Sequence, residues 1–235
     1  MNPWEHIDTA TLPNGDVMTL QRRADEFSLR VANVELMNSR QHGSEELLAA
    51  LAVDGLGAVG GVNVLVGGLG MGFTLRAVLD LLPQDARVTV AELVPQVVEW
   101  NRSHLGGLAD HPLTDPRVSV VVGDVAHLLR AAAATFDIVL LDTDNGPEGT
   151  TQEDNEWLYG PAGLGAIRTA LKPGGVLAVW SVFPSEAFTR LLGRAGFEAE
   201  VKYVRSRGKK GNRHVIWVAK RRLSGGAAKS HRAVK

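Results

Sequence analysis

The stretch Val64-Leu-Val-Gly-Gly-Leu-Gly-Met-Gly72 joins a short apolar run to a segment with helical periodicity. Its glycines are Gly67, Gly68, Gly70 and Gly72. Glycine lets the backbone pass close to a ligand, and the N-terminus of the following helix offers free N–H groups to a polar or anionic group. We therefore expect a buried strand, a turn and a helix, with all four glycines beside a bound ligand. A tight turn without a ligand is the alternative.

The chain beyond this stretch alternates apolar runs with helical segments. The predicted strands are residues 62–66, 87–91, 118–122, 136–141 and 176–180, and the predicted helices are residues 74–82, 95–105, 125–134 and 162–171. Continuous apolar strands separated by helices are typical of a parallel sheet that is covered on both faces. The pattern therefore predicts an α/β fold.

The two ends of the chain depart from this alternation. Residues 198–204 and 214–219 are predicted strands joined by a short basic loop without a helix, so they must pair antiparallel. Residues 18–23 and 27–31 alternate apolar and polar side chains, which predicts a small N-terminal β-hairpin unit. The whole pattern is that of a Rossmann-like class I methyltransferase fold: a mostly parallel sheet with an antiparallel C-terminal strand pair.

The predicted domains follow from these elements. Residues 1–43 form the small β-rich unit, residues 44–220 form the Rossmann-like domain, and residues 221–235 form a tail that we expect to be disordered. A helix is expected to begin at Ser44, whose hydroxyl could cap it.

Composition narrows the function classes. Lys+Arg (25) and Asp+Glu (26) nearly balance in 235 residues, so no overall field draws the chain to nucleic acid or a membrane, although the basic loop 205–213 could contact a phosphate. There are no cysteines, and the histidines show no metal-ligand spacing, so we predict no metal. The N-terminus does not resemble a signal peptide, and a cytoplasmic protein is expected.

The spacing of the glycines indicates which ligand binds. A dinucleotide fingerprint would place a glycine where Phe73 stands, whereas Gly68-x-Gly70-x-Gly72 is associated with S-adenosylmethionine. Glu92 stands at the end of the second strand, about 20 residues after Gly72, and could accept hydrogen bonds from both ribose hydroxyls. Asp124 follows the third strand and could accept a hydrogen bond from the adenine amine. Ligands of open α/β sheets bind at such strand ends.

Two further carboxylates, Asp142 and Asp144, follow the fourth strand. A carboxylate can take the proton that an attacking amine must lose, and neighbouring carboxylates raise each other's pKa, so both are candidate catalytic residues. An Asx turn is the alternative. Trp157 and Tyr159 follow a polar stretch, residues 148–156, that could form a lid, so they are candidate substrate-binding residues; equally, they could belong to the core.

These motifs together resemble the spermidine synthase family and its bacterial relatives. The resemblance rests on the glycine loop and on residues 90–99, 115–124 and 136–147. It implies transfer of an aminopropyl group from decarboxylated S-adenosylmethionine to putrescine by a homodimer. It also implies that Glu92 holds the ribose, Asp124 holds the adenine and Asp142 activates the amine.

The sequence also departs from the family pattern. The loop aspartate that binds the amine of the aminopropyl group is replaced by Gly70. The Asp-Ser-Ser-Asp-Pro motif becomes Asp-Thr-Asp-Asn-Gly-Pro at residues 142–147. In the Tyr-x-Glu element the tyrosine becomes Ser44, and Glu46 stands at the glutamate position as a candidate substrate-binding residue.

The change at Gly70 decides the leading hypothesis. An aspartate there would attract the ammonium of the decarboxylated cofactor and repel the carboxylate of intact S-adenosylmethionine. Its loss predicts a transferase that uses S-adenosylmethionine to methylate a small amine. The alternatives are aminopropyl transfer from the decarboxylated cofactor and, third, a cofactor-binding protein without catalytic activity.

Overall fold

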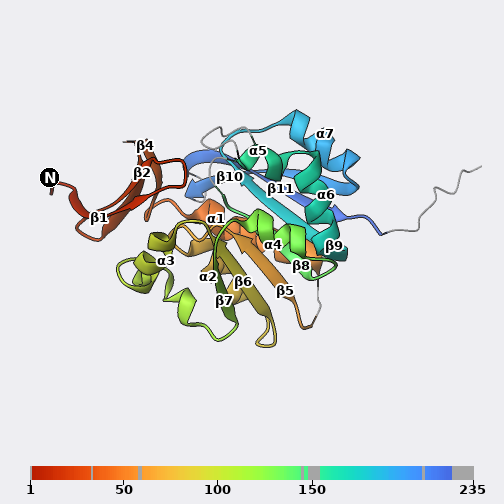
Figure 1. Ribbon diagram of the computed structural model, residues 1–235, viewed down its shortest axis with the longest axis horizontal. Helices are drawn as coiled ribbons and strands as arrows, with labels where there is room; N and C mark the ends of the chain where they lie inside the picture. Colours follow the sequence, from red (N-terminus) through yellow and green to blue (C-terminus); the bar gives the residue numbers. More distant parts are fainter. Residues whose placement is uncertain are drawn as a thin grey trace, which may run out of the picture.

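The computed structural model describes residues 2–32, 34–57, 60–143, 146–147, 154–207 and 210–223, which form two sheets (Figure 1). The N-terminal sheet is antiparallel in the order β1-β2-β3-β4. Its strands are β1 (Glu5–Thr11), β2 (Val17–Arg23), β3 (Glu26–Val31) and β4 (Val34–Asn38). The sequence predicted the β2–β3 hairpin; it did not predict β1 and β4.

The larger sheet has the order β10-β11-β9-β8-β5-β6-β7. Its parallel strands are β5 (Asn63–Gly67), β6 (Arg87–Glu92), β7 (Val118–Val122), β8 (Phe136–Leu141) and β9 (Leu171–Ser181). Strands β10 (Phe197–Arg207) and β11 (Lys210–Arg221) pair antiparallel, and β11 also pairs antiparallel with β9. The predicted mostly parallel sheet with an antiparallel C-terminal pair is confirmed.

Helices cover both faces of this sheet. They are α1 (Gly43–Leu56), α2 (Phe73–Leu81), α3 (Pro95–Arg102), α4 (Val125–Ala131), α5 (Asp154–Tyr159), α6 (Pro161–Ala170) and α7 (Glu186–Arg194), with short 3-10 turns at Gly106–Ala109 and Pro112–Thr114. Successive strand residues point to opposite faces, so Val64 and Val66 pack in the core with α1, α2 and α3, whereas Leu65 packs with α4 to α7. This explains why β5 is continuously apolar.

The N-terminal sheet is joined to the larger domain by a shared core and by a hydrogen bond between Trp100 and Asp8. Leu20 and Leu29 belong to the same buried cluster as Val97 and Trp100 of α3. The Trp100 indole Nε1 donates to Asp8 Oδ2 of β1 at 2.7 Å. The sheet therefore packs beside the carboxyl ends of the parallel strands, where Figure 1 shows it next to α3 and α1.

Candidate active site at the carboxyl ends of the strands

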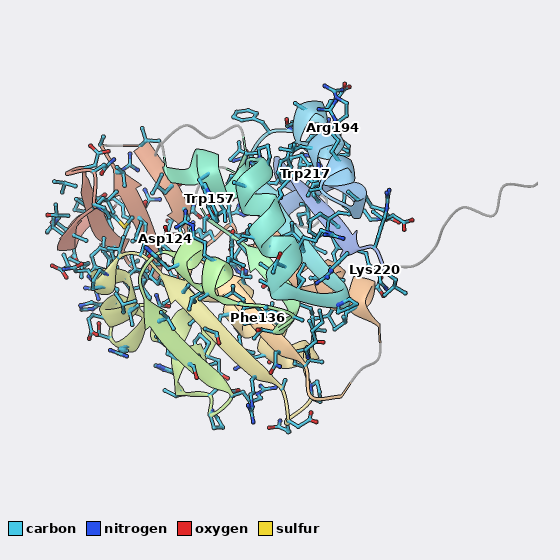
Figure 2. All side chains as sticks on the ribbon, turned by 45° about the vertical axis from the view of Figure 1, so that its right-hand side comes forward. Asp124, Phe136, Trp157, Arg194, Trp217 and Lys220 are labelled. Carbon is cyan, nitrogen blue, oxygen red and sulfur yellow. The ribbon has the colours of Figure 1, made fainter. Side chains whose placement is uncertain are left out.

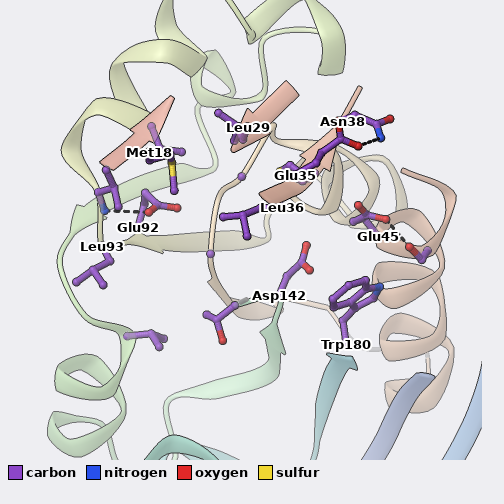
Figure 3. A pocket seen from close by; sticks show the side chains of 18 of the residues that line it. Met18, Leu29, Glu35, Leu36, Asn38, Glu45, Glu92, Leu93, Asp142 and Trp180 are labelled. Carbon is purple, nitrogen blue, oxygen red and sulfur yellow. Dashed lines mark hydrogen bonds between the residues drawn. The ribbon is translucent and has the colours of Figure 1, made fainter. Parts of the chain in front are cut away.

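A cavity of about 280 Å³ lies between the carboxyl ends of the parallel strands, α1 and the N-terminal sheet (Figure 3). Parallel strands all end at the same edge, so polar residues that follow β5, β6, β7 and β8 meet there. The N-terminal sheet contributes an apolar wall, which consists of Leu12, Met18, Leu29, Leu36 and Met37. No sequence pattern predicted that this sheet would line the cavity.

Two of the four glycines in the turn after β5 line the cavity. Gly68 has φ +90°, and a Cβ there would lie 2.4 Å from the carbonyl oxygen of Asp142. Gly70, with φ +51°, also lines the cavity. Gly67 and Gly72 do not line it, because Gly67 packs against Val125 and Leu141 and Gly72 is the N-cap of α2 against Asn101. Gly68 and Gly70 are thus the two glycines of the turn that line the cavity, and the contact of all four with a ligand stays a prediction.

Glu92, at the end of β6, is buried and lines the cavity. Its carboxylate accepts from the backbone N–H of Leu69, in the glycine turn, and from that of Val94, both at 2.9 Å. These two bonds fix the carboxylate relative to the turn. Each carboxylate oxygen can accept more than one hydrogen bond, so the group can still accept hydroxyl donors from a ligand.

Asp124 follows β7 and is the N-cap of α4. Its Oδ1 accepts from the backbone N–H of Ala126 at 2.8 Å, and the residue lines the cavity. The cap holds the carboxylate at the strand end and leaves further acceptor positions toward the cavity. Its predicted place at the ligand edge agrees with this geometry.

Asp142 follows β8 and projects into the cavity (Figure 3). The hydroxyl of Thr74, in the first turn of α2, donates to Asp142 Oδ2 at 2.5 Å. This bond orients one oxygen of a carboxylate that was predicted to be catalytic. Asp144, its predicted partner, lies outside the described residues.

The three predicted substrate-binding residues do not line the cavity. Tyr159 is buried, and its hydroxyl lies 2.8 Å from Thr143 Oγ1. The ring of Trp157, which is labelled in Figure 2, packs against the guanidinium of Arg130, whose Cζ lies 3.7 Å from the ring centroid. Both side chains thus have packing partners of their own, and their role in substrate binding stays a prediction. Most of the stretch expected to form a lid, residues 148–153, lies outside the described residues.

Glu46, the third predicted substrate-binding residue, lies outside the cavity lining. Its carboxylate pairs with His42 Nδ1 at 2.8 Å, and its side chain is 53% exposed. The helix begins one residue before Ser44, with His42 at the N-cap, and Ser44 donates to Glu45 instead of capping the helix. Because of this helical phase, the neighbouring Glu45 lines the cavity and Glu46 does not.

Glu45 and Trp180 are site residues that the sequence analysis missed. Glu45 is only 7% exposed, and burial, together with the charge of Asp142, raises its pKa to about 7. Trp180, near the end of β9, stacks on His214 of β11 with ring centroids 4.7 Å apart. Burial lowers the pKa of His214, which therefore contributes little positive charge at neutral pH. No short motif marks these positions, because three distant elements bring them together.

The described lining of the cavity is acidic. Its ionisable residues are the carboxylates Glu35, Glu45, Glu92, Asp124 and Asp142, together with His214. None of the described lining residues is Lys or Arg. The cavity therefore favours a cationic ligand over an anionic one. The described residues contain no cluster of side chains suited to a metal ion, and none of their helices is long and apolar enough to cross a membrane.

The fold and the strand-end site define a Rossmann-like α/β domain of the class I methyltransferase type. A family model, the spermine/spermidine synthase domain, matches residues 44–185, which is more than half of the chain. The chain therefore belongs to the spermine/spermidine synthase family. The solved spermidine synthase of Thermotoga maritima has the same fold, with a TM-score of 0.75 over 93% of this chain and 74% of that one, at 18% identity.

Curated relatives of two kinds match about half of this chain. A polyamine aminopropyltransferase of Prochlorococcus marinus is 33% identical over 131 residues, which are 55% of this chain and 43% of that protein. Putrescine N-methyltransferase 2 of Nicotiana attenuata is 34% identical over 116 residues, which are 49% of this chain and 29% of that protein. The matches thus span less than half the length of these relatives.

Proposed function

We propose that this chain is an aminopropyltransferase that moves the aminopropyl group of decarboxylated S-adenosylmethionine to a small amine such as putrescine. The acidity of the cavity carries the proposal, because its described lining holds five carboxylates and no Lys or Arg. Both substrates are cations: one is a sulfonium with a primary ammonium group, and the other is a diamine. The matches to polyamine aminopropyltransferases support the same reaction.

Two carboxylates are placed to hold the adenosine part of the cofactor. Glu92 is fixed by the backbone of the glycine turn and has acceptor capacity left for the ribose hydroxyls. Asp124 lies one strand further along the same edge and can accept from the adenine amine. Gly68 and Gly70 line the cavity between these groups and Asp142, so the ligand would pass along the backbone of the glycine turn.

Asp142 is the residue we assign to the amine. The cofactor supplies an electrophilic carbon beside its sulfonium sulfur. When the amine nitrogen forms a bond to this carbon, the carbon–sulfur bond breaks, its electron pair stays on sulfur and methylthioadenosine leaves. The nitrogen must lose one proton, and the Asp142 carboxylate, held by Thr74, can accept it. Asp144 remains a proposed second carboxylate for the same step.

Methyl transfer from intact S-adenosylmethionine is the second candidate, and the similarity to putrescine N-methyltransferases favours it. The absence of an aspartate at Gly70 was the sequence argument for this reaction. However, intact S-adenosylmethionine carries a carboxylate, and the described cavity lining offers it no Lys or Arg. The acidity of the site as a whole therefore ranks aminopropyl transfer first.

Product analysis tests the proposal. We expect the purified protein, supplied with putrescine and decarboxylated S-adenosylmethionine, to form spermidine and methylthioadenosine in equal amounts by mass spectrometry. Putrescine with intact S-adenosylmethionine should give little N-methylputrescine. Asp142→Asn should lower kcat by about 100-fold or more, as expected for loss of a general base.

The control is Asp137→Asn, at the opposite end of β8, where Asp137 pairs with Lys172 at 2.7 Å far from the reacting groups. It should keep near-normal kcat. Formation of N-methylputrescine without spermidine would replace the proposal with methyl transfer. No product from either cofactor, in protein that still binds methylthioadenosine, would leave only a binding function.

A further inference from the structure

One end of the cavity is built by Glu45 in the first turn of α1, Asp142 after β8 and Trp180 near the end of β9. Figure 3 shows the three side chains at the same end of the cavity, with the indole of Trp180 below Glu45 and to the right of Asp142 in that view. Both carboxylates line the cavity, and the charge of Asp142 contributes to the raised pKa of Glu45. Three elements that are far apart in sequence thus bring two carboxylates and an aromatic face together.

This arrangement is unfavourable for the protein alone. Glu45 is 7% exposed, and its hydrogen bond from the hydroxyl of Ser44, at 2.5 Å, offsets only part of the cost of burying a carboxylate beside another one. A cation placed between Glu45 and Asp142 would remove their repulsion. One face of the Trp180 indole is stacked on His214, and a cation on its other face would gain a cation–π interaction, which is strongest for indole rings.

We propose that Glu45, Asp142 and Trp180 form a subsite for a primary aliphatic ammonium group. The proposal rests on the aminopropyl-transfer function proposed above, and it assigns to α1 the acidic group that the glycine loop lacks at Gly70. Gly70 itself could not regain an acidic side chain without displacing Met37, whose sulfur would lie 2.9 Å from an added Cβ.

The shape of the subsite agrees with a small ammonium group. Ser44 holds one oxygen of Glu45 and Thr74 holds one oxygen of Asp142, so both carboxylates are oriented before a ligand arrives. The same chemistry is present in two substrates: the aminopropyl end of the decarboxylated cofactor and either end of putrescine. The binding experiment below separates these two sources.

Calorimetric titration at pH 8 tests the subsite with three probes. Methylthioadenosine carries no ammonium group, decarboxylated S-adenosylmethionine carries one, and putrescine is added to protein saturated with methylthioadenosine. We expect Glu45→Gln to bind methylthioadenosine within twofold of the wild type, which also shows that the variant is folded. The ammonium ligand held by the subsite should bind about tenfold to hundredfold more weakly.

The matched variant is Glu46→Gln, which makes the same chemical change one residue away on a half-exposed side chain outside the cavity. It should bind all three probes within twofold of the wild type. Weakening of the decarboxylated cofactor by Glu45→Gln would assign the subsite to the aminopropyl end, and weakening of putrescine alone would assign it to the acceptor.

The proposal is overturned if Glu45→Gln binds both ammonium ligands as tightly as the wild type, or if Glu46→Gln weakens them equally. Failure of the proposed function gives a different result. In that case the wild type would bind the ammonium ligands in a Glu45-dependent manner and form no spermidine. If the wild type bound neither ammonium ligand, both the function and the subsite would be excluded.

Discussion

Glu45 shows how one residue can favour binding at the expense of stability. Its pKa in the folded chain is raised to about 7 by burial and by Asp142, with a smaller contribution from Glu46 on the same helix, whereas the ordinary value is 4.5. Between these two values the folded state binds more protons than the unfolded state. Folding stability therefore falls as pH rises from about 4.5 to 7 and stays lower above that range, by on the order of 3 kcal/mol.

We expect Glu45→Gln to stabilise the protein at pH 8 by about 1–3 kcal/mol, since it removes the buried charge and keeps the shape of the side chain. At pH 5, where wild-type Glu45 is largely protonated, the gain should mostly vanish. Urea unfolding at both pH values, without ligand, measures the difference. Glu46→Gln serves as the control, because loss of its exposed pair with His42 should change stability by less than about 1 kcal/mol.

Equal stability of the wild type and Glu45→Gln at pH 8 would contradict this prediction. That outcome would mean that Glu45 is solvated in solution and carries no penalty. It would remove the electrostatic argument for the ammonium subsite, although binding by Glu45 itself is measured separately by titration.

At this scale the sequence predicted some site residues and missed others for a geometric reason. Glu92, Asp124 and Asp142 each follow a predicted strand, and parallel strands end together, so their position needs no tertiary detail. Glu45 and Glu46 are chemically identical neighbours, and successive residues on a helix point about 100° apart. The helix phase relative to the sheet decides which one enters the cavity, and the sequence motif does not contain this information.

At the scale of elements, the site depends on how closely the ends of β5 and β8 approach each other. The carbonyl oxygen of Asp142 would lie 2.4 Å from a Cβ at Gly68, where φ is +90°. The backbone N–H of Asp142 also donates to the carbonyl of Gly67 at 2.9 Å. A side chain at Gly68 would therefore separate the two strand ends that carry the proposed catalytic and cofactor-binding groups.

Gly68→Ala should unfold at lower urea concentration, with a loss of more than about 2 kcal/mol, and should lose affinity for methylthioadenosine. Gly15→Ala is a matched control, because Gly15 has nearly the same φ, +87°, and nothing within 4 Å of an added Cβ. Its cost should be only the left-handed backbone strain of about 1–2 kcal/mol, with methylthioadenosine binding intact. Equal losses in the two variants would show that the strand ends can separate without consequence.

Strands with a strong hydrophobic pattern were predicted from the sequence, and strands without one were missed. Strands β7 and β8 coincide with residues 118–122 and 136–141 as predicted, because both are largely apolar runs, although β8 is buried inside the sheet and β7 is only partly buried at its edge. Strand β4 was missed because its side chains are mostly exposed or partly buried, so it has no strong apolar pattern. It nevertheless supplies Glu35, Leu36 and Met37 to the cavity, so this part of the cavity lining was not visible in the sequence.

At the scale of the whole molecule, the cavity exists because the N-terminal sheet packs over the strand ends. This packing depends on the shared apolar core and on the hydrogen bond from Trp100 of α3 to Asp8 of β1, which is also the main cause of the lowered pKa of Asp8. Because the sheet forms one wall of the cavity, its attachment should control the affinity for the part of the ligand that it covers.

Trp100→Phe tests this coupling, because it keeps a buried aromatic ring and removes the indole donor. We expect a stability loss of about 1 kcal/mol. Amide hydrogen exchange should become faster in β1 to β4 and change little in β5 to β9. Binding of the decarboxylated cofactor should weaken severalfold, since the loosened sheet contributes Leu12, Met18 and Leu29 to the wall of the cavity.

Arg22→Gln provides the comparison, because Arg22 pairs with Glu5 at 3.1 Å within the N-terminal sheet and both side chains are exposed. This change should leave hydrogen exchange and cofactor binding near wild-type values, as expected for an exposed ion pair. Faster exchange throughout β5 to β9 in Trp100→Phe would instead show that the two sheets unfold as one cooperative unit. The hydrogen bond would then contribute to global stability, and the N-terminal sheet would not act as a separately adjustable wall of the site.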